Sequence, residues 1–310
     1  MNNLIKYSIH KEDTFIYLKI YIKFTNIIRG DNMRKTIIIL AMVIIGMLIP
    51  IGFATSDTQV VITYGETTHH NANYKNTVDD FFIKQAGVDL NTVESKIITA
   101  GEVNKIASTI TGKTYSSNQI YSSALVDLND NDNLEVSVDK SKITTITGDM
   151  YISALKSAGI TAGHVYVTSP VTATGESALT GIMNSYEVVT DVEIPDTVKE
   201  AANNEIYTQA EIVKNSDVDA DELSKLVDDV KEEVETNNVT DHQTIVNIIN
   251  NYTINYNINI TNSDIENLAE SIEQIQNVQG DINNYQTEVS DVLNSTDANG
   301  ATDFISGLFN

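Results

Sequence analysis

The chain has 310 residues, a formal net charge of −24, and 41% hydrophobic against 20% charged residues. This length and composition suit one large or two modest globular domains and argue against wholesale disorder. The negative charge argues against nucleic acid as a partner, and the absence of cysteine excludes disulfides, thiolate nucleophiles and zinc–thiolate sites.

An uncharged apolar segment, residues 36–54, directly follows Arg34 and Lys35. It has the basic flank, apolar core and small-x-small ending (Gly52-Phe53-Ala54) of a signal peptide. It is also just long enough to span a bilayer as an uncleaved anchor, since a membrane helix needs about 20 residues. A buried core helix is disfavoured because the run carries no charge. The basic flank stays inside, so we expect everything after Thr55 to lie outside the cytoplasm.

Met33 stands immediately before the basic pair, and a start there gives a signal peptide of ordinary length. We therefore expect residues 1–32 to be a non-native extension and residues 33–54 a signal peptide or membrane anchor. The alternative is a genuine cytoplasmic tail. The first 54 residues are net basic and the remainder strongly acidic, an asymmetry typical of an exported protein.

Strand-like and helix-like segments alternate over residues 57–190. Runs of β-branched residues predict strands, and apolar residues at helical spacing predict helices. The expected strands are residues 59–64, 96–99 and 164–169, and the expected helices are residues 74–86, 102–110 and 148–160, the last capped by Thr147. Thr174 is expected to cap a further helix. We predict an α/β (or α+β) core with a mixed sheet and packed helices over residues 57–190.

A turn-rich segment, residues 129–133, separates two further strand-like runs, residues 120–127 and 135–138. Asn and Asp favour turns, so this pattern predicts a β-hairpin. Asp127, Asn129 and Asn131 also mimic the first three ligands of a calcium loop. The hairpin is favoured because Asp132 replaces the glycine that such a loop requires.

Residues 195–295 are predicted to form a mainly helical part of the same domain. Amphipathic helices are expected over residues 197–214 and 221–236, followed by a helix over residues 245–249 opened by a Thr240–Gln243 capping box. Residues 254–260 alternate isoleucine or tyrosine with asparagine, which predicts a strand.

A last long helix is expected to begin at a Thr261–Asp264 capping box and to run through Leu293. Gln279 and Gln286 occupy two of its heptad core positions. We therefore expect a helix docked on the domain and no long coiled coil. Residues 296–310 form a tail.

No pattern in the sequence identifies a chemical site. His69 and His70 would need a third metal ligand from elsewhere, so a solvated loop is favoured, and His164 is interpreted as a structural strand residue. Phosphate-binding loops and nucleophile elbows are absent. We assign no catalytic, cofactor-binding or metal-ligating residue and no cofactor.

Two further surface features have ordinary explanations. Asp217, Asp219 and Asp221 repeat a calcium-like spacing, but they precede a helix, where acidic side chains meet the positive end of the helix dipole. Asn-x-Ser/Thr sequons could carry glycans in an exported chain, although an Asn-rich sequence produces them by chance. They lie at Asn238, Asn251, Asn259 and Asn294.

Residues 148–187 contain three elements in order: a D-M-Y-x-x-A-L-x-x-A-G helix, a V-Y-V-T-x-P strand and a G-x-x-A-L-T-G-I-M segment. In these elements the chain resembles the YpuA-like family of exported proteins (domain of unknown function 1002). The resemblance extends over about residues 57–293 and implies a signal peptide. It implies no catalytic or binding residues. The Asn-rich run over residues 247–262 is longer than the family leads us to expect.

We expect a non-enzymatic protein of the cell envelope, or a secreted one, that interacts with a surface polymer, another protein or itself. It would contact the membrane only through residues 36–54. The alternatives are a carboxylate-dependent hydrolase of envelope material and a small-ligand or calcium-binding protein. A cleft that holds two carboxyl groups of raised pKa would favour the hydrolase, and flat acidic surfaces with one apolar patch would favour the interaction module.

Overall fold

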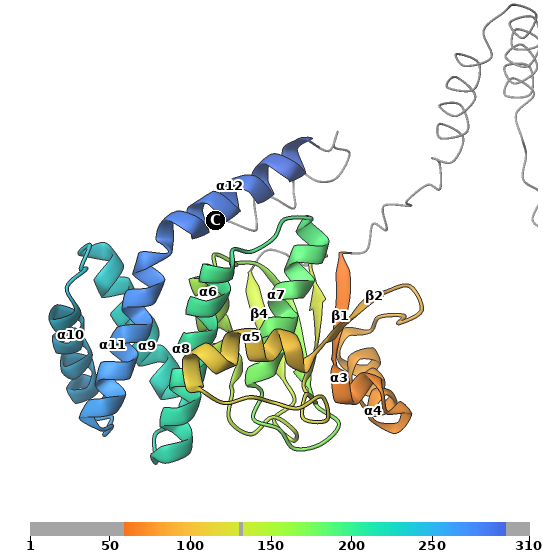
Figure 1. Cartoon of the computed structure of the whole chain (residues 1–310), viewed down its shortest axis with the longest axis horizontal. Helices are drawn as coiled ribbons and strands as arrows, with labels where there is room; N and C mark the ends of the chain where they lie inside the picture. The colour runs from red at the N-terminus through yellow and green to blue at the C-terminus, as the bar shows by residue number, and fades with distance from the viewer. Residues whose placement is uncertain (1–58, 130–132, 296–310) are drawn as a thin grey trace, which may run out of the picture. The chain divides into compact units, whose positions relative to one another are not determined.

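The computed structural model describes residues 59–129 and 133–295 (Figure 1). The predicted export segment, the tail after residue 295 and the middle of the predicted hairpin turn lie outside these described residues. Within them, no helix combines the length and apolar character needed to cross a membrane.

A five-stranded mixed sheet forms the centre of the first part, as predicted. Its order is β2-β1-β3-β5-β4. The central strand β3 runs antiparallel to both neighbours, whereas β1 with β2 and β4 with β5 are parallel pairs. The strands are β1 (Val60–Gly65), β2 (Glu94–Ile98), β3 (Ser123–Asp127), β4 (Leu134–Val138) and β5 (Gly163–Thr168).

The predicted hairpin is wrong, because β3 and β4 do not pair. Strand β5 lies between them, and Val165 is opposite Val126 on one side and Val136 on the other. Burial explains the order: five of the six residues of β5 are buried, as befits an inner strand, whereas β4 exposes Glu135 and is an edge. The turn residues between β3 and β4 do not indicate that another strand, β5, lies between them in the sheet.

Helices cover both faces of the sheet. Val78 and Phe82 of α4 pack on Ile62 and Tyr64 of β1. The opposite face, which includes Val126, lies in a larger core with residues of α5, α6 and α7. The helices of this part are α3 (Glu66–His69), α4 (Ala72–Ala86), α5 (Ala100–Thr111), α6 (Gly148–Ser157) and α7 (Glu176–Thr190).

Most helix ends follow the sequence signals. Thr147 caps α6 by accepting a hydrogen bond from the Met150 amide, and Gly87 ends α4 in a left-handed conformation. Thr174 is not a cap. Gly175 holds that position of α7, and the Thr174 hydroxyl bonds the Glu176 carboxylate instead.

Three of the remaining described helices, α9 to α11, form a second layer with a core of its own. Residues of α9, α10 and α11 make this second core, and α8 contributes to both cores through Ile206 and Ile212. Figure 1 shows α8 between the sheet-covering helices and the α9–α11 group. The helices are α8 (Asp196–Asn215), α9 (Ala220–Thr236), α10 (His242–Tyr256), α11 (Asn262–Asn277) and α12 (Gln279–Ser295).

The predicted strand over residues 254–260 is wrong. Helix α10 continues to Tyr256 and ends at Asn257, whose left-handed φ is 54°. The buried side chains of α10, such as Ile245 and Ile249, recur at helical spacing and extend the helix through the alternating stretch. The cap was also misplaced, because Asp241, not Thr240, accepts the Thr244 amide.

The last predicted helix is two helices. The Thr261–Asp264 capping box opens α11 as predicted, but α11 ends at Asn277 with Val278 as its C-cap, and α12 begins at Gln279. Ile282, Tyr285 and Val289 of α12 join the core of the α/β part. The prediction that this segment docks on the domain is therefore confirmed. The interruption at Val278 was not visible in the heptad spacing.

Candidate functional site

The residues of the three-element family motif lie mostly in the core. Met150, Tyr151 and Leu155 of α6 are fully buried, and the Tyr151 hydroxyl donates a 2.6 Å hydrogen bond to the Gly175 carbonyl. Gly181 of α7 lies so close to Thr63 that a Cβ there would be 3.0 Å from the threonine methyl. These residues of the motif therefore serve packing.

Two motif serines belong to a buried polar network between α6, α8 and α9. Lys231 Nζ lies 2.9 Å from Glu205 Oε1, 3.2 Å from Asp228 Oδ1 and 2.7 Å from Ser153 Oγ. The Ser157 hydroxyl donates to the other Glu205 oxygen at 2.6 Å. Glu205 is completely buried. A single ammonium group on α9 thus joins the neighbouring helix α8 to α6, which lies much earlier in the sequence.

This network has a structural role: it bonds α6, α8 and α9 to one another. A lysine beside a serine can activate a nucleophile when the lysine is free to accept the serine proton. Here the Lys231 ammonium group is shared between Glu205 and Asp228, and Ser153 is itself fully buried. A substrate could not reach the hydroxyl, so the geometry supports bonding between helices and not catalysis.

The histidines do not assemble a metal site, and no cluster of three or more ligating side chains occurs among the residues the structure describes. His69 and His70 lie in and beside the short helix α3 instead of the expected loop, with ring centroids 5.4 Å apart. Burial, followed by repulsion from His70 and Lys75, lowers the pKa of His69. His164 lies in β5, stacked on Tyr166 at 4.2 Å.

The two calcium-like patterns serve backbone geometry. Asp219 accepts the amides of Asp221 and Glu222 at 3.0 Å each and so caps α9. Asp127 accepts the Asn129 amide at 2.9 Å in a turn. The remaining positions of the first pattern include residues outside the described ranges.

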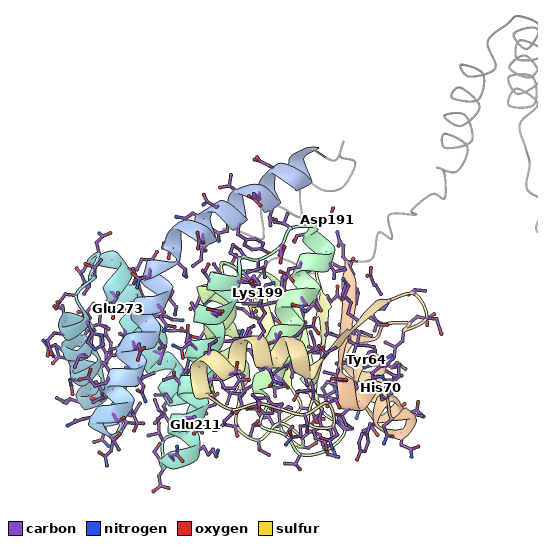
Figure 2. All side chains as sticks on the ribbon, viewed as in Figure 1. Tyr64, His70, Asp191, Lys199, Glu211 and Glu273 are labelled. Atoms are coloured by element: carbon purple, nitrogen blue, oxygen red, sulfur yellow. The ribbon has the colours of Figure 1, made fainter. Side chains whose placement is uncertain are left out.

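His242 at the start of α10 bridges two glutamates of α11. Its Nε2 lies 2.9 Å from Glu266 and its Nδ1 lies 3.0 Å from Glu273, which is labelled in Figure 2. These hydrogen bonds, the one to Glu266 most strongly, raise the pKa of His242 against an opposing effect of desolvation. The protonated ring donates to both carboxylates and fastens α10 to α11.

We expect the His242 contact to stabilise the fold at low pH only. Because the folded-state pKa is raised, the contribution is complete below the unfolded value of about 6.5 and disappears as the pH rises through the folded value. The side chains are partly exposed, so the effect is below about 1 kcal/mol. The free energies of unfolding of wild type and His242→Gln, measured in urea, should differ at about pH 6 and converge at about pH 8. An equal difference at both pH values would contradict this prediction.

An open groove of about 630 Å³ lies between α5, α8 and α11. This volume is in the range of small-molecule and peptide pockets, roughly 300–1,000 Å³. Lys113, which follows α5, pairs with Glu211 of α8 at 2.7 Å. Asn204 of α8 donates to Gln274 of α11 at 2.8 Å. The three walls are thus connected by polar contacts, and Glu211 is labelled in Figure 2.

Several polar side chains of the groove have no hydrogen-bond partner among the described residues. Glu200 and Thr208 line it from α8, and Asn267, Glu270 and Asn277 line it from α11. Residues at these spacings share a helix face. Two facing rows of donors and acceptors therefore remain available to a ligand.

Glu211 and Tyr207, two side chains of the groove, both have a pKa displaced away from neutral pH. The hydrogen bond from Lys113 lowers the pKa of Glu211, although desolvation opposes it, so this carboxyl group is an anion and not a proton donor. Burial raises the pKa of Tyr207 far above its usual range. Neither group is poised near neutral pH, where a general acid or base works best.

The sequence analysis did not find this groove. The polar residues that line α8 and α11 recur three, four or seven positions apart, which is the one local signal that these helices share a polar face. Nothing in the spacing shows that the two faces are opposed, because that depends on how α8 packs between the two cores.

Comparison with known proteins agrees with the family resemblance. Residues 64–292 match the family described as "Protein of unknown function (DUF1002)". Over 202 residues the chain is 30% identical to the "Uncharacterized protein YpuA" of Bacillus subtilis (strain 168), covering 64% of this chain and 69% of that protein. No solved structure matches the chain. The fold, the central motif and the extent of the match together place this chain in the DUF1002 family.

Proposed function

We propose that this protein is an extracytoplasmic, non-enzymatic interaction module that holds a polar partner in the groove between α5, α8 and α11. The single observation that supports this role most is the set of unengaged polar side chains on facing helices. The extracytoplasmic location is supported by residues 36–54 and by the acidity of everything after them.

The hydrolase alternative receives less support. Three described carboxyl groups, Asp196, Glu211 and Asp241, have a displaced pKa, and each is lowered by hydrogen bonds, from Lys105, Lys113 and Thr244 respectively. A catalytic acid needs the opposite displacement. The groove therefore has features of a binding surface.

Filling the groove should abolish capture of the partner. We expect the pair Asn267→Tyr and Asn277→Tyr to reduce retention of envelope material by the full-length chain about tenfold or more, because two exposed side chains would be replaced by rings that occupy the groove. The matched control is Asn247→Tyr with Asn251→Tyr, two exposed positions on α10. Retention is measured by affinity capture from envelope extract of the host.

The same preparation tests the location. Native protein should be recovered from the envelope or medium, and N-terminal sequencing should begin near Thr55 if residues 36–54 are cleaved. Recovery from the cytosol would refute the extracytoplasmic role. Equal retention by the groove pair and the control pair would refute the groove, and net release of polymer fragments would favour the hydrolase.

A further inference from the structure

We infer that the groove binds an extended peptide segment that carries a lysine side chain. This inference rests on the proposed binding role of the groove and adds the class of ligand. It depends on three properties of the lining: its charge, its amides and the position of its aromatic ring.

The charge of the lining selects against anions. Four carboxylates of the described residues line the groove: Glu200, Glu211, Asp264 and Glu270. Among the described residues that line it, Lys113 is the one cation, and Glu211 lies 2.7 Å from its ammonium group. An anionic polymer would meet repulsion without an available counter-charge, whereas a cationic group would be attracted.

Two of the four carboxylates accept no hydrogen bond from the described residues and can receive an ammonium group, although Glu200 also attracts Lys105, which is paired with Asp196. Glu211 is held by Lys113, and Asp264 accepts hydrogen bonds from Thr261 in the capping box of α11. Glu200 and Glu270 remain, one from each facing helix. A lysine ammonium group has three donors on a long flexible stem and can reach acceptors on either wall.

The amides suit a peptide backbone beside that ammonium group. Asn267 and Asn277 present unengaged side-chain amides, each of which offers donors and an acceptor. A peptide unit has the complementary donor and acceptor. These amides lie on the same helix as Glu270, so backbone and side-chain recognition would occur along a single face of α11.

A glycan fits less well. Sugar rings bind proteins by placing their apolar face on an exposed aromatic ring. Among the described residues of the lining, Tyr207 is the one aromatic residue; it is only 4% exposed, and its hydroxyl interacts with Tyr115. The ring therefore fills the core below the groove and presents no stacking surface.

Calorimetric titration of the full-length chain with three synthetic peptides tests the inference. The first has one lysine within uncharged polar residues, the second carries Nε-acetyl-lysine at that position, and the third carries glutamate. We expect affinity to fall in that order, by about two- to fivefold for each step, which is the range of exposed ion pairs.

Variants locate the effect. Glu200→Gln and Glu270→Gln should each weaken the lysine peptide about two- to fivefold and leave the acetylated peptide unchanged, because only the charge is removed. The matched control is Glu288→Gln on α12, which removes the same charge from an exposed helix position outside the groove. Thermal melting verifies that all three variants fold.

The outcomes separate this inference from the proposed function. If the lysine and acetyl-lysine peptides bind equally and the Asn267→Tyr, Asn277→Tyr pair blocks both, the lysine preference is overturned and the binding groove stands. If Glu288→Gln weakens binding as much as the groove variants do, attraction to the whole acidic surface explains the result and the inference is overturned. If no peptide binds while the groove still captures envelope material, the peptide class is overturned.

Discussion

Replacing Lys231 with methionine should lower the free energy of unfolding by about 3–5 kcal/mol, the usual cost of breaking a buried ion pair. The variant leaves the Glu205 carboxylate fully buried, with serine hydroxyls and an amide as its remaining partners among the described residues. Urea unfolding followed by circular dichroism measures the loss as a lower transition midpoint at an unchanged slope.

Lys225→Met is the matched control. Lys225 lies on the same helix α9 and is exposed, and its ammonium group lies 5.6 Å from the centre of the Tyr256 ring. Its replacement should cost about 0.5–1 kcal/mol, which is typical of an exposed cation–π contact. Adding Glu205→Gln to Lys231→Met removes the unpaired charge and should restore part of the loss. Equal effects of the two lysine variants would show that the network contributes nothing specific.

Gly175→Ala should be almost as damaging. Gly175 has a φ of 112°, and a Cβ there would lie 2.8 Å from both Ile143 Cγ2 and the Tyr151 hydroxyl. Backbone strain at positive φ costs about 1–2 kcal/mol, and forcing extra volume into a packed site adds about 1–3 kcal/mol. The clash also disturbs the hydrogen bond from Tyr151 to the Gly175 carbonyl.

Gly87→Ala separates the cost of backbone strain from the cost of the steric clash. Gly87 also has a positive φ, 68°, but a Cβ there has no atom within 4 Å. Its replacement should therefore show the strain alone, about 1–2 kcal/mol. Thermal unfolding of both variants provides the comparison. A Gly175 variant no less stable than the Gly87 variant would mean that the packing around Tyr151 yields easily.

The sequence predicted the individual helices and strands better than it predicted which of them pack or pair with one another. Local signals such as the Thr261–Asp264 box and Gly87 placed helix ends correctly, because caps act within a few residues. Strand order failed at β4, whose position depends on β5, which follows it by some 25 residues in the chain. The alternation over residues 254–260 also gave a wrong prediction. In a segment with one face exposed to solvent, a short run of asparagine and isoleucine is compatible with the period of a helix as well as with that of a strand.

The candidate groove could not be predicted for a similar reason. Glu200 and Glu270 belong to helices 47 residues apart at their nearest ends, α8 and α11, which the sequence gives no reason to oppose. The network around Lys231 was equally hidden, because each of its charges appears as one member of an ordinary charged helix. Clusters of this kind arise from packing, and single-sequence patterns do not report packing partners.

Helix α12 has a consequence for how the chain acquires its structure. Ile282, Tyr285 and Val289 occupy the same core as Val126 of the central strand. A chain delivered from its N-terminus, whether by a ribosome or through a membrane pore, therefore cannot close that core until almost its whole length has emerged. Contacts between such distant segments slow folding, and a chain truncated before residue 282 should stay open and vulnerable to proteases.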